Sequence, residues 1–275
     1  MSTPTSTTSH DYSVTSSCET FSRDVDQHIR FLEITLQLAH FIDVQFAPLL
    51  RSVVALLELE TIADSDEPRY NLDTMKTVLD QMPKMIDRFQ SFDQVWLGSL
   101  HIVDFFLTYL SALLTEAHRT RPEMLKSSES VTFEEILEHQ TMDELIMSLI
   151  EQKVTKLSFK GMETLAKDVE KTTRFRLFPQ QEDLDRAIRI IEVRNLLVHN
   201  RGIVNKIFLS RVQNSKLELG NTILLEPSSV AKDMDFLIRS AIAIDRRAAD
   251  KWCIPTPHEI EFIGPDTLGQ IQENA

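Results

Sequence analysis

Apolar residues recur at helical spacing along most of this chain, and this pattern constrains its fold more than any other feature. The six glycines among 275 residues leave few sites for tight turns. Pro48 predicts a kink or break in the first long helix. Between Asp24 and Ala63 the apolar positions are Ile29, Leu32, Leu36, Ala39, Phe41, Ile42, Phe46, Leu49, Leu50, Val53 and Leu57. Their spacing is that of a buried helix face, so the sequence predicts an all-α protein with long helices.

Later segments repeat the helical pattern and mark helix boundaries. Residues 72–118 predict a long helix or helix pair interrupted near Pro83. Thr132 and Glu135 have the spacing of a capping box at the start of a short helix, and residues 142–157 predict the next one. Residues 179–200 open with a proline and acidic side chains and stop before Gly202, as a helix does. Residues 226–252 predict a final amphipathic helix.

The ends of the chain differ from this helical middle. Residues 1–19 are rich in Ser and Thr with little to bury, so we expect a disordered tail there. We expect one helical domain over residues 20–252 and a C-terminal tail over residues 253–275. The segment "KLELGNTILLE" alternates in polarity around Gly220-Asn221, as a small β-hairpin would. The predicted fold is a bundle of long antiparallel helices with one hairpin after the helix 179–200.

Charge and cysteine content narrow the functional classes. The net charge of −13 argues against indiscriminate binding to long nucleic acids, which depends on cationic contacts to phosphate. Residues 180–251 are less acidic, with 12 Lys and Arg against 10 Asp and Glu. Cys18 and Cys253 support neither a disulfide framework nor a thiolate metal site, so we expect a cytoplasmic protein. The apolar run 95–114 contains His101 and Asp104, which favours a buried helix over a membrane span.

The last turns of the helix 179–200 gather polar side chains on one arc. On a helical wheel, Arg194, Asn195, His199 and Glu192 fall together, away from the apolar arc that contains Val193 and Leu197. Ile188 and Leu196 lie on or beside the polar arc, so a monomer would leave apolar groups next to charge. We therefore expect a second copy to cover this face through Ile188 and Leu196.

A solvated helix face is the simplest alternative for this polar arc. An Arg followed by a His at this distance arises by chance, and Arg23 with His28 is such a match. The Asn directly after Arg194 makes the match much more specific, because Arg23 is followed by Asp24. An incidental match in an interaction bundle is therefore kept as the second alternative given below.

The segment "RNLLVHNRG" resembles the Arg-Asn-three-residues-His signature of the HEPN superfamily. The resemblance extends to "FFLTYLSALLTEAHRTRPEMLKSS" and "LELGNTILLEPSSVAKDMDFL", and so covers roughly residues 85–250. It implies a HEPN-like helical bundle and a metal-independent endoribonuclease, in which two bundles pair through their motif helices. The matching residues are Arg194, Asn195 and His199. The sequence is most similar in character to HEPN domains that are encoded beside RNA-processing and defence genes in prokaryotes.

The residue types suit the activity that the resemblance implies. RNA cleavage needs a group that transfers a proton at the 2′-hydroxyl or at the leaving 5′-oxygen, and an imidazole does this near neutral pH. We therefore expect His199 to be the proton-transfer group. A guanidinium can stabilise the negative charge that develops around the phosphorus, so we expect Arg194 to have this role. Asn195 would orient His199 or the phosphate, Glu192 would hold Arg194 or fix the histidine tautomer, and Arg201 is a candidate phosphate contact.

The expected partners follow from the same reading. They are an RNA substrate, a second copy of the chain, and a neutralising or defence-system protein if the chain is a toxin or antiviral effector. No cofactor, metal ion or membrane is expected. The first alternative is a HEPN module that binds RNA or protein without cleaving, and the second is the interaction bundle.

Overall fold

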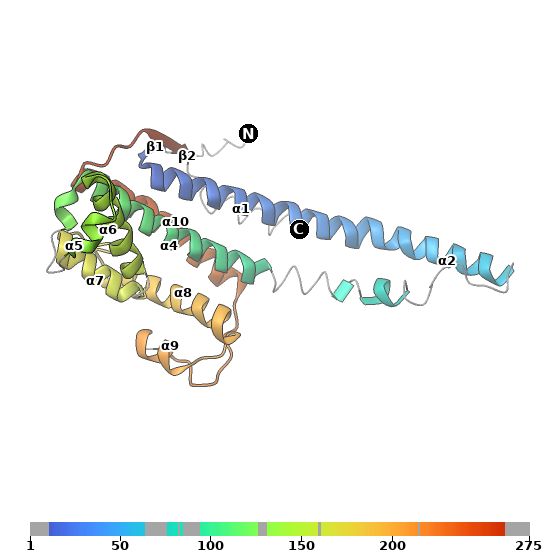
Figure 1. The fold of residues 1–275 in the computed structure, drawn as a ribbon. Coiled ribbons are helices and arrows are strands. Elements are labelled where there is room, and N and C mark those ends of the chain that lie inside the picture. Colours follow the sequence, from blue (N-terminus) through green and yellow to red (C-terminus); the bar gives the residue numbers. More distant parts are fainter. Residues whose placement is uncertain are drawn as a thin grey trace, which may run out of the picture. The chain divides into compact units, whose positions relative to one another are not determined.

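The computed structural model describes residues 11–63, 76–81, 83–84, 94–125, 131–158, 161–213 and 215–261. Of the described residues, 77% are helical and 4% are in strands, which confirms the predicted all-α class. The elements in Figure 1 are β1 (Asp11–Val14), α1 (Ser16–Phe41), the π-helix η1 (Ile42–Phe46), α2 (Ala47–Ala63), α4 (Gln94–Thr120), the 3-10 helix η3 (Pro122–Leu125), α5 (Phe133–Leu137), α6 (Met142–Ser158), α7 (Met162–Thr173), α8 (Gln181–Asn200), α9 (Lys206–Arg211), α10 (Pro227–Trp252) and β2 (His258–Glu261).

The chain divides into two compact units, where the sequence predicted one domain. Unit 1 contains residues 1–25 and 100–275, and unit 2 contains residues 26–99. Residues 20–84, which carry no part of the motif, therefore fall mainly in unit 2. All of the predicted site residues belong to unit 1.

Several helix boundaries agree with the sequence signals. Thr132 caps α5 as predicted: its hydroxyl accepts a hydrogen bond from Glu135 N at 3.2 Å, and the Glu135 carboxylate accepts one from Thr132 N at 2.8 Å. Helices α8 and α10 occupy the segments predicted for them. The predicted interruption near Pro83 lies at the edge of residues that are not described, although residues 76–81 are helical.

Pro48 does not break the first long helix. The helix passes through a π-helical turn directly before it, in which Ala47 N–H donates to the carbonyl of Ile42 five residues earlier. A proline has no N–H and its ring crowds the preceding turn. The π turn lies where that disturbance falls, so α1 continues into α2 without a loop.

Both ends of the described chain form short strands, so the prediction of disorder is wrong for residues 11–19. Strand β1 pairs antiparallel with β2, with Asp11 opposite Glu261 and Val14 opposite His258. Strand β1 and the start of α1 therefore lie within the predicted disordered segment 1–19, and β2 lies within the predicted tail 253–275. The sequence pattern did not reveal these strands, because each has only four residues and depends on a partner far away in the chain.

The predicted hairpin around Gly220 is also wrong. The segment pairs with residues 202–204 through an isolated bridge between Ile203 and Thr222. Val204 N–H donates to Asn221 O at 2.8 Å, and Ile223 N–H donates to Gly202 O at 2.9 Å. The two paired segments therefore enclose α9.

The core of unit 1 is built on α4 and α10. Buried residues of α4 include Ile102, Phe106, Tyr109, Leu110 and Leu113, as the sequence predicted for a buried helix. Residues 100–120 and residues 16–56 are each long and apolar enough to cross a membrane by length and composition, a test that a core helix of a soluble protein also passes.

A buried polar network ties the N-terminal segment to this core. The carboxylate of Asp245 on α10 accepts hydrogen bonds from Thr15 N at 3.0 Å and from Thr15 Oγ1 at 2.6 Å. The hydroxyl of Tyr109 donates to Ala241 O at 3.0 Å. Burial raises the pKa of Asp245, and the hydrogen bonds from Thr15 oppose that rise. The hydrogen bonds from Thr15 therefore stabilise the ionised form of Asp245.

Thr15→Val should destabilise the protein by about 1–3 kcal/mol, because it removes the hydroxyl that donates to Asp245 Oδ1 and keeps only the backbone N–H donor to Asp245 Oδ2. The raised pKa of Asp245 means that its ionisation costs stability as the pH rises through that pKa, and Thr15 offsets the cost. The loss should therefore be larger at about pH 7.5 than at about pH 4. Thermal melting at both pH values measures it, with the exposed Thr20→Val as control. An equal loss at both values would contradict the assignment.

Candidate functional site

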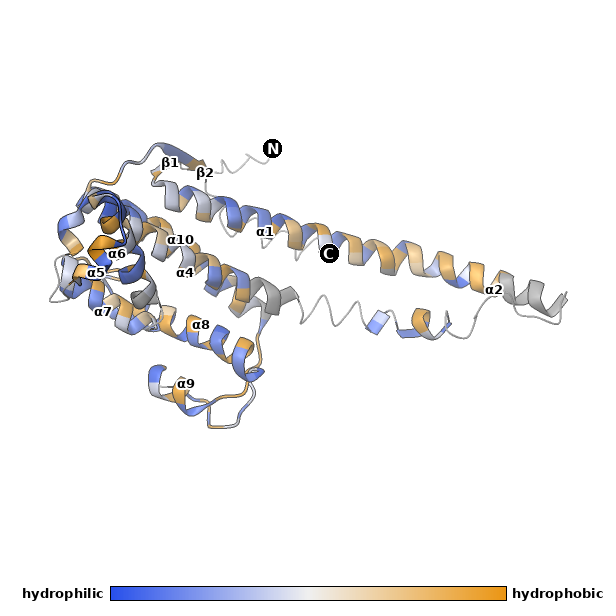
Figure 2. Ribbon diagram, in the orientation of Figure 1, coloured by the Kyte–Doolittle hydropathy of each residue, from blue (hydrophilic) through white to orange (hydrophobic). Residues whose placement is uncertain are grey.

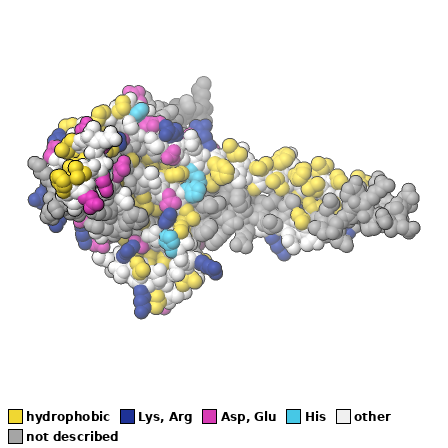
Figure 3. Space-filling view, viewed as in Figure 1, with side chains coloured by type: hydrophobic (Ala, Val, Ile, Leu, Met, Phe, Trp, Pro, Cys, Tyr) yellow, Lys and Arg dark blue, Asp and Glu magenta, His cyan; other side chains and the backbone are white. Residues whose placement is uncertain are grey.

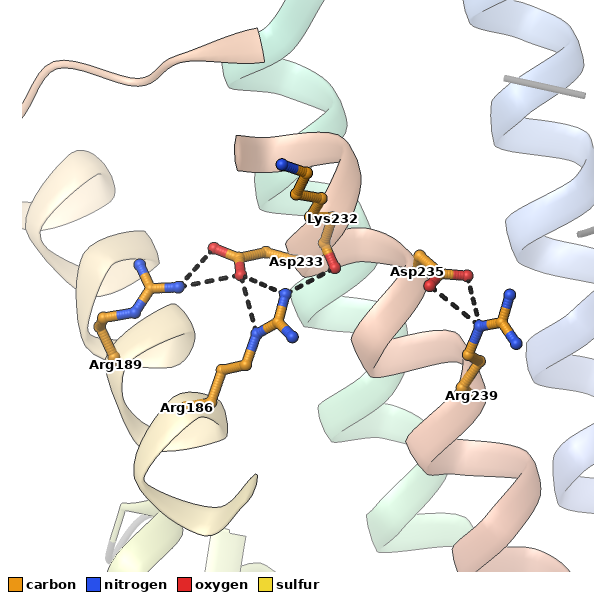
Figure 4. Close-up of polar contacts among 6 residues, drawn as sticks. All are labelled: Arg186, Arg189, Lys232, Asp233, Asp235 and Arg239. Atoms are coloured by element: carbon orange, nitrogen blue, oxygen red, sulfur yellow. Dashed lines mark hydrogen bonds and ion pairs between the residues drawn. The ribbon is translucent and has the colours of Figure 1, made fainter. Parts of the chain in front are cut away.

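The motif helix α8 is anchored to α10 through its first half. Arg186 and Arg189 both reach the carboxylate of Asp233, at 3.0 and 2.8 Å, as Figure 4 shows. The guanidinium of Arg186 also lies over the ring of Phe236, 4.4 Å from its centroid. Two arginines sharing one carboxylate fix the rotation of α8, and hence the direction in which its last turns point.

The C-terminal end of α8 reverses the chain. Arg201 adopts a left-handed conformation with φ of 52°, and Gly202 N–H donates to the carbonyl of Leu196 at 2.9 Å. Gly202 also has a positive φ of 76°, which favours glycine. The predicted stop at Gly202 is therefore confirmed, and the chain turns back toward α9.

Helix α9 packs against the last turns of α8. The side chain of Asn205 caps α9 by accepting a hydrogen bond from Phe208 N at 2.9 Å. Leu196 forms a buried cluster with Val204, Phe208 and Val212. This cluster holds α9 beside the polar arc of α8 and makes it one wall of a cleft.

The cleft has a volume of about 490 Å³ and gathers the motif. It lies among α4, α8, α9 and the start of α7. The polar side chains that line it are Ser111, Glu192, Arg194, Asn195, His199, Asn205 and Arg211. Arg194, Asn195 and His199, which the sequence placed on one arc, therefore face one space. Arg201 is exposed and is not among the described lining residues.

Arg194 is held by partners from this chain. Its Nη2 lies 2.7 Å from Asp104 Oδ1 on α4, and its Nη1 donates to the amide oxygen of Asn195 at 3.3 Å. Its side chain is 20% exposed, and its buried Nε has no hydrogen-bond partner within the described residues. The guanidinium is thus fixed in place at the cleft, and its Nε–H donor is unused by the described residues.

His199 is more open than Arg194. Its side chain is exposed, and within the described part of the chain its ring has no hydrogen-bond partner. An exposed imidazole can accept a proton from, or donate one to, a molecule in the cleft.

Glu192 does not hold Arg194 or His199, which corrects the role predicted for it. Its carboxylate is 6% exposed and pairs with Arg211 Nη1 at 2.8 Å. Arg211 is the last residue of α9, and its guanidinium lies beside Gly161, whose position would place a Cβ 3.7 Å from Arg211 Nη1. Glu192 therefore connects the motif helix to α9.

The predicted dimer contacts on the motif helix are also corrected. Ile188 is 6% exposed and Leu196 is 3% exposed within a single chain. The wheel placed them beside the polar arc correctly, but α9 covers Leu196 from within the same chain. Neither side chain needs a second copy to remove it from water.

Sequence reasoning did not assign a role in the site to Asp104, which pairs with Arg194, or to Arg211, which lines the cleft. Asp104 interrupts the apolar run of α4, and a charge in such a run signals a buried partner. Arg211 had no recognisable signal, because α9 is short and its position depends on the turn at Gly202.

Within the described residues, no group of three or more His, Cys, Asp or Glu side chains is placed to hold a metal ion. Comparisons of the chain with protein-family models, with curated proteins and with solved structures found no match. The chemistry of the site therefore rests on its own geometry and on the motif.

Arg211→Met should destabilise the protein by about 2 kcal/mol, because it leaves the buried Glu192 carboxylate unpaired. The value lies below that for a fully buried pair because Arg211 is partly exposed. The double variant Glu192→Met with Arg211→Met should recover most of the loss, as measured by urea unfolding.

The control for this cycle is Lys167→Met, which removes an exposed ion pair with Glu163 and should change stability by less than about 0.5 kcal/mol. Additive losses in the double variant would show that Glu192 and Arg211 do not stabilise each other.

Proposed function

We propose that this chain is a HEPN-type endoribonuclease that cleaves RNA without a metal ion. The observation that carries the proposal is the convergence of Arg194, Asn195 and His199 on one cleft of a single chain. The residue types are those that the resemblance assigns to catalysis.

His199 is the proton-transfer group in this proposal. Its ring takes the proton of a ribose 2′-hydroxyl, and the 2′-oxygen forms a bond to the adjacent phosphorus. The bond from phosphorus to the 5′-oxygen breaks, and the departing oxygen takes up a proton. The products are a 2′,3′-cyclic phosphate and a 5′-hydroxyl. The exposed ring of His199 supports this role, because the step needs direct contact with the substrate.

Arg194 and Arg211 supply positive charge on two sides of the cleft. Asp104 fixes Arg194, and Glu192 fixes Arg211, so both guanidinium groups are positioned before RNA binds. Each guanidinium carries five N–H donors, which exceeds what one carboxylate accepts. The phosphate would therefore share the arginines with these carboxylates, which suits a substrate that must leave after reaction.

A second function is favoured by one contact. The ion pair of Arg194 with Asp104 and the low exposure of Arg194 suit a structural arginine. A HEPN module that binds RNA without cleaving it would keep the cleft and lose only the chemistry. Cleavage assays separate the two.

His199→Ala should reduce RNA cleavage by about 100-fold or more, because it removes the proton-transfer group. Helicity and thermal melting should not change, since the side chain is exposed. The assay uses the full chain with end-labelled single-stranded and hairpin RNA, and the matched control is His40→Ala, an exposed histidine outside the cleft. Full activity of His199→Ala would reject the assignment, and binding without cleavage by the unaltered protein would favour the second function.

Cleavage should survive an excess of chelator, and the 3′ ends should be 2′,3′-cyclic phosphates. The reason is that the 2′-oxygen is the nucleophile, with no metal-bound water involved. Mass spectrometry of the products identifies the ends. Chelator-sensitive cleavage that leaves 3′-hydroxyl ends would contradict this mechanism.

A further inference from the structure

Unit 2 carries a row of exposed apolar side chains along one side of α1, η1 and α2. Figure 2 shows hydrophobic residues along these helices, and Figure 3 shows such side chains gathered on their surface. We call this row the α1–α2 stripe. It consists of Phe31, Ile34, Leu38, Phe41, Phe46, Leu49, Val53 and Leu56, which are 42–64% exposed.

The spacing of the stripe is regular apart from one step. Steps of three and four residues alternate from Phe31 to Phe41 and again from Phe46 to Leu56. The step from Phe41 to Phe46 is five residues, which in an α-helix would turn the side chain by about 140° away from the row. The π turn η1 spans these five residues and accommodates one extra residue. Phe46 therefore returns to the row, about 40° from Phe41, as an ordinary four-residue step would place it.

Alternating steps of three and four are the spacing of a coiled-coil contact row. Side chains at such positions insert between those of a facing helix. Another face of the helix includes the buried residues Ala39, Ala47 and Val54, and Arg51 donates to the carbonyl of Leu79 at 3.3 Å. The α1–α2 stripe is therefore a second apolar face, and it is exposed among the described residues.

The stripe is large enough for a stable interface. Eight large apolar side chains at about half exposure present on the order of 800 Å² of surface. Monomers rarely expose contiguous apolar patches of more than about 300–600 Å², whereas a standard interface buries about 800 Å² on each partner.

We propose that the α1–α2 stripe is the surface through which two copies of this chain pair. A twofold arrangement places the same row on both sides of the contact, so the three-four spacing matches itself. The flanking residues Thr35, Gln37 and Ser52 carry no charge, and the flanking Arg30 is paired with Asp26 of its own chain at 2.8 Å. Repulsion between like charges is therefore small when two copies approach.

A lipid bilayer suits the stripe less well. A helix that crosses a membrane is apolar on all sides, and this one carries Glu33 and Arg51 on the face opposite the stripe. The pairing surface is separate from the motif cleft, so it does not depend on the proposed ribonuclease activity.

The test measures the mass of the full chain by light scattering between about 1 and 100 μM. The unaltered protein should be a dimer, and Leu38→Glu with Leu49→Glu should be a monomer of unchanged helicity. The matched control is Leu224→Glu, which alters an exposed leucine outside unit 2 and should leave the dimer intact. A monomeric unaltered protein, or a dimer that survives both glutamates, would overturn the proposal.

A second measurement covers the case in which the double variant fails to fold. A photoreactive phenylalanine analogue replaces Phe41 in otherwise unaltered protein, and irradiation should give a crosslinked dimer. The same analogue at Leu224 should give none. Absence of crosslinking from position 41, or a monomer that co-floats with phosphatidylcholine vesicles, would assign the stripe to another occupant and overturn the proposal.

Discussion

A carboxylate that is almost completely removed from water must have a partner, and on the motif helix that carboxylate is Glu192. Its partner, Arg211, lies at the end of α9, so the charge requirement and the apolar packing of Leu196 hold the same short helix in place. Without α9 the polar arc of α8 would be a flat surface. The cleft exists because one buried charge on α8 is neutralised from a neighbouring element.

The candidate site could be predicted in part from the sequence. The helical wheel brought Arg194, Asn195 and His199 together, because residues on one arc of a helix stay together whatever surrounds it. It could not show that α9 covers the same helix, since a six-residue helix after a turn leaves little periodicity to detect. The wheel consequently left Leu196 exposed and gave Glu192 the wrong partner.

The fold divides in the same way between local and distant determinants. The cap at Thr132 and the stop at Gly202 depend on neighbours within a few residues, and both were predicted. The pairing of β1 with β2 and the bridge from Ile203 to Thr222 depend on segments that meet only in the folded chain, and both were missed. The helical spacing of residues 24–63 predicted the helix, but the π turn that keeps its apolar row aligned depends on backbone geometry around Pro48.

The hydrogen bonds from Thr15 to Asp245 and the pairing of β1 with β2 join the two ends of the described chain. Contacts of such long sequence separation carry a large loop-closure cost and form late in folding. During synthesis β1 emerges before the described helices α1 to α10, and its partner β2 emerges after them. The segment that contains β1 therefore waits for residues 258–261 to be made, and it is a part that a chaperone would meet unpaired.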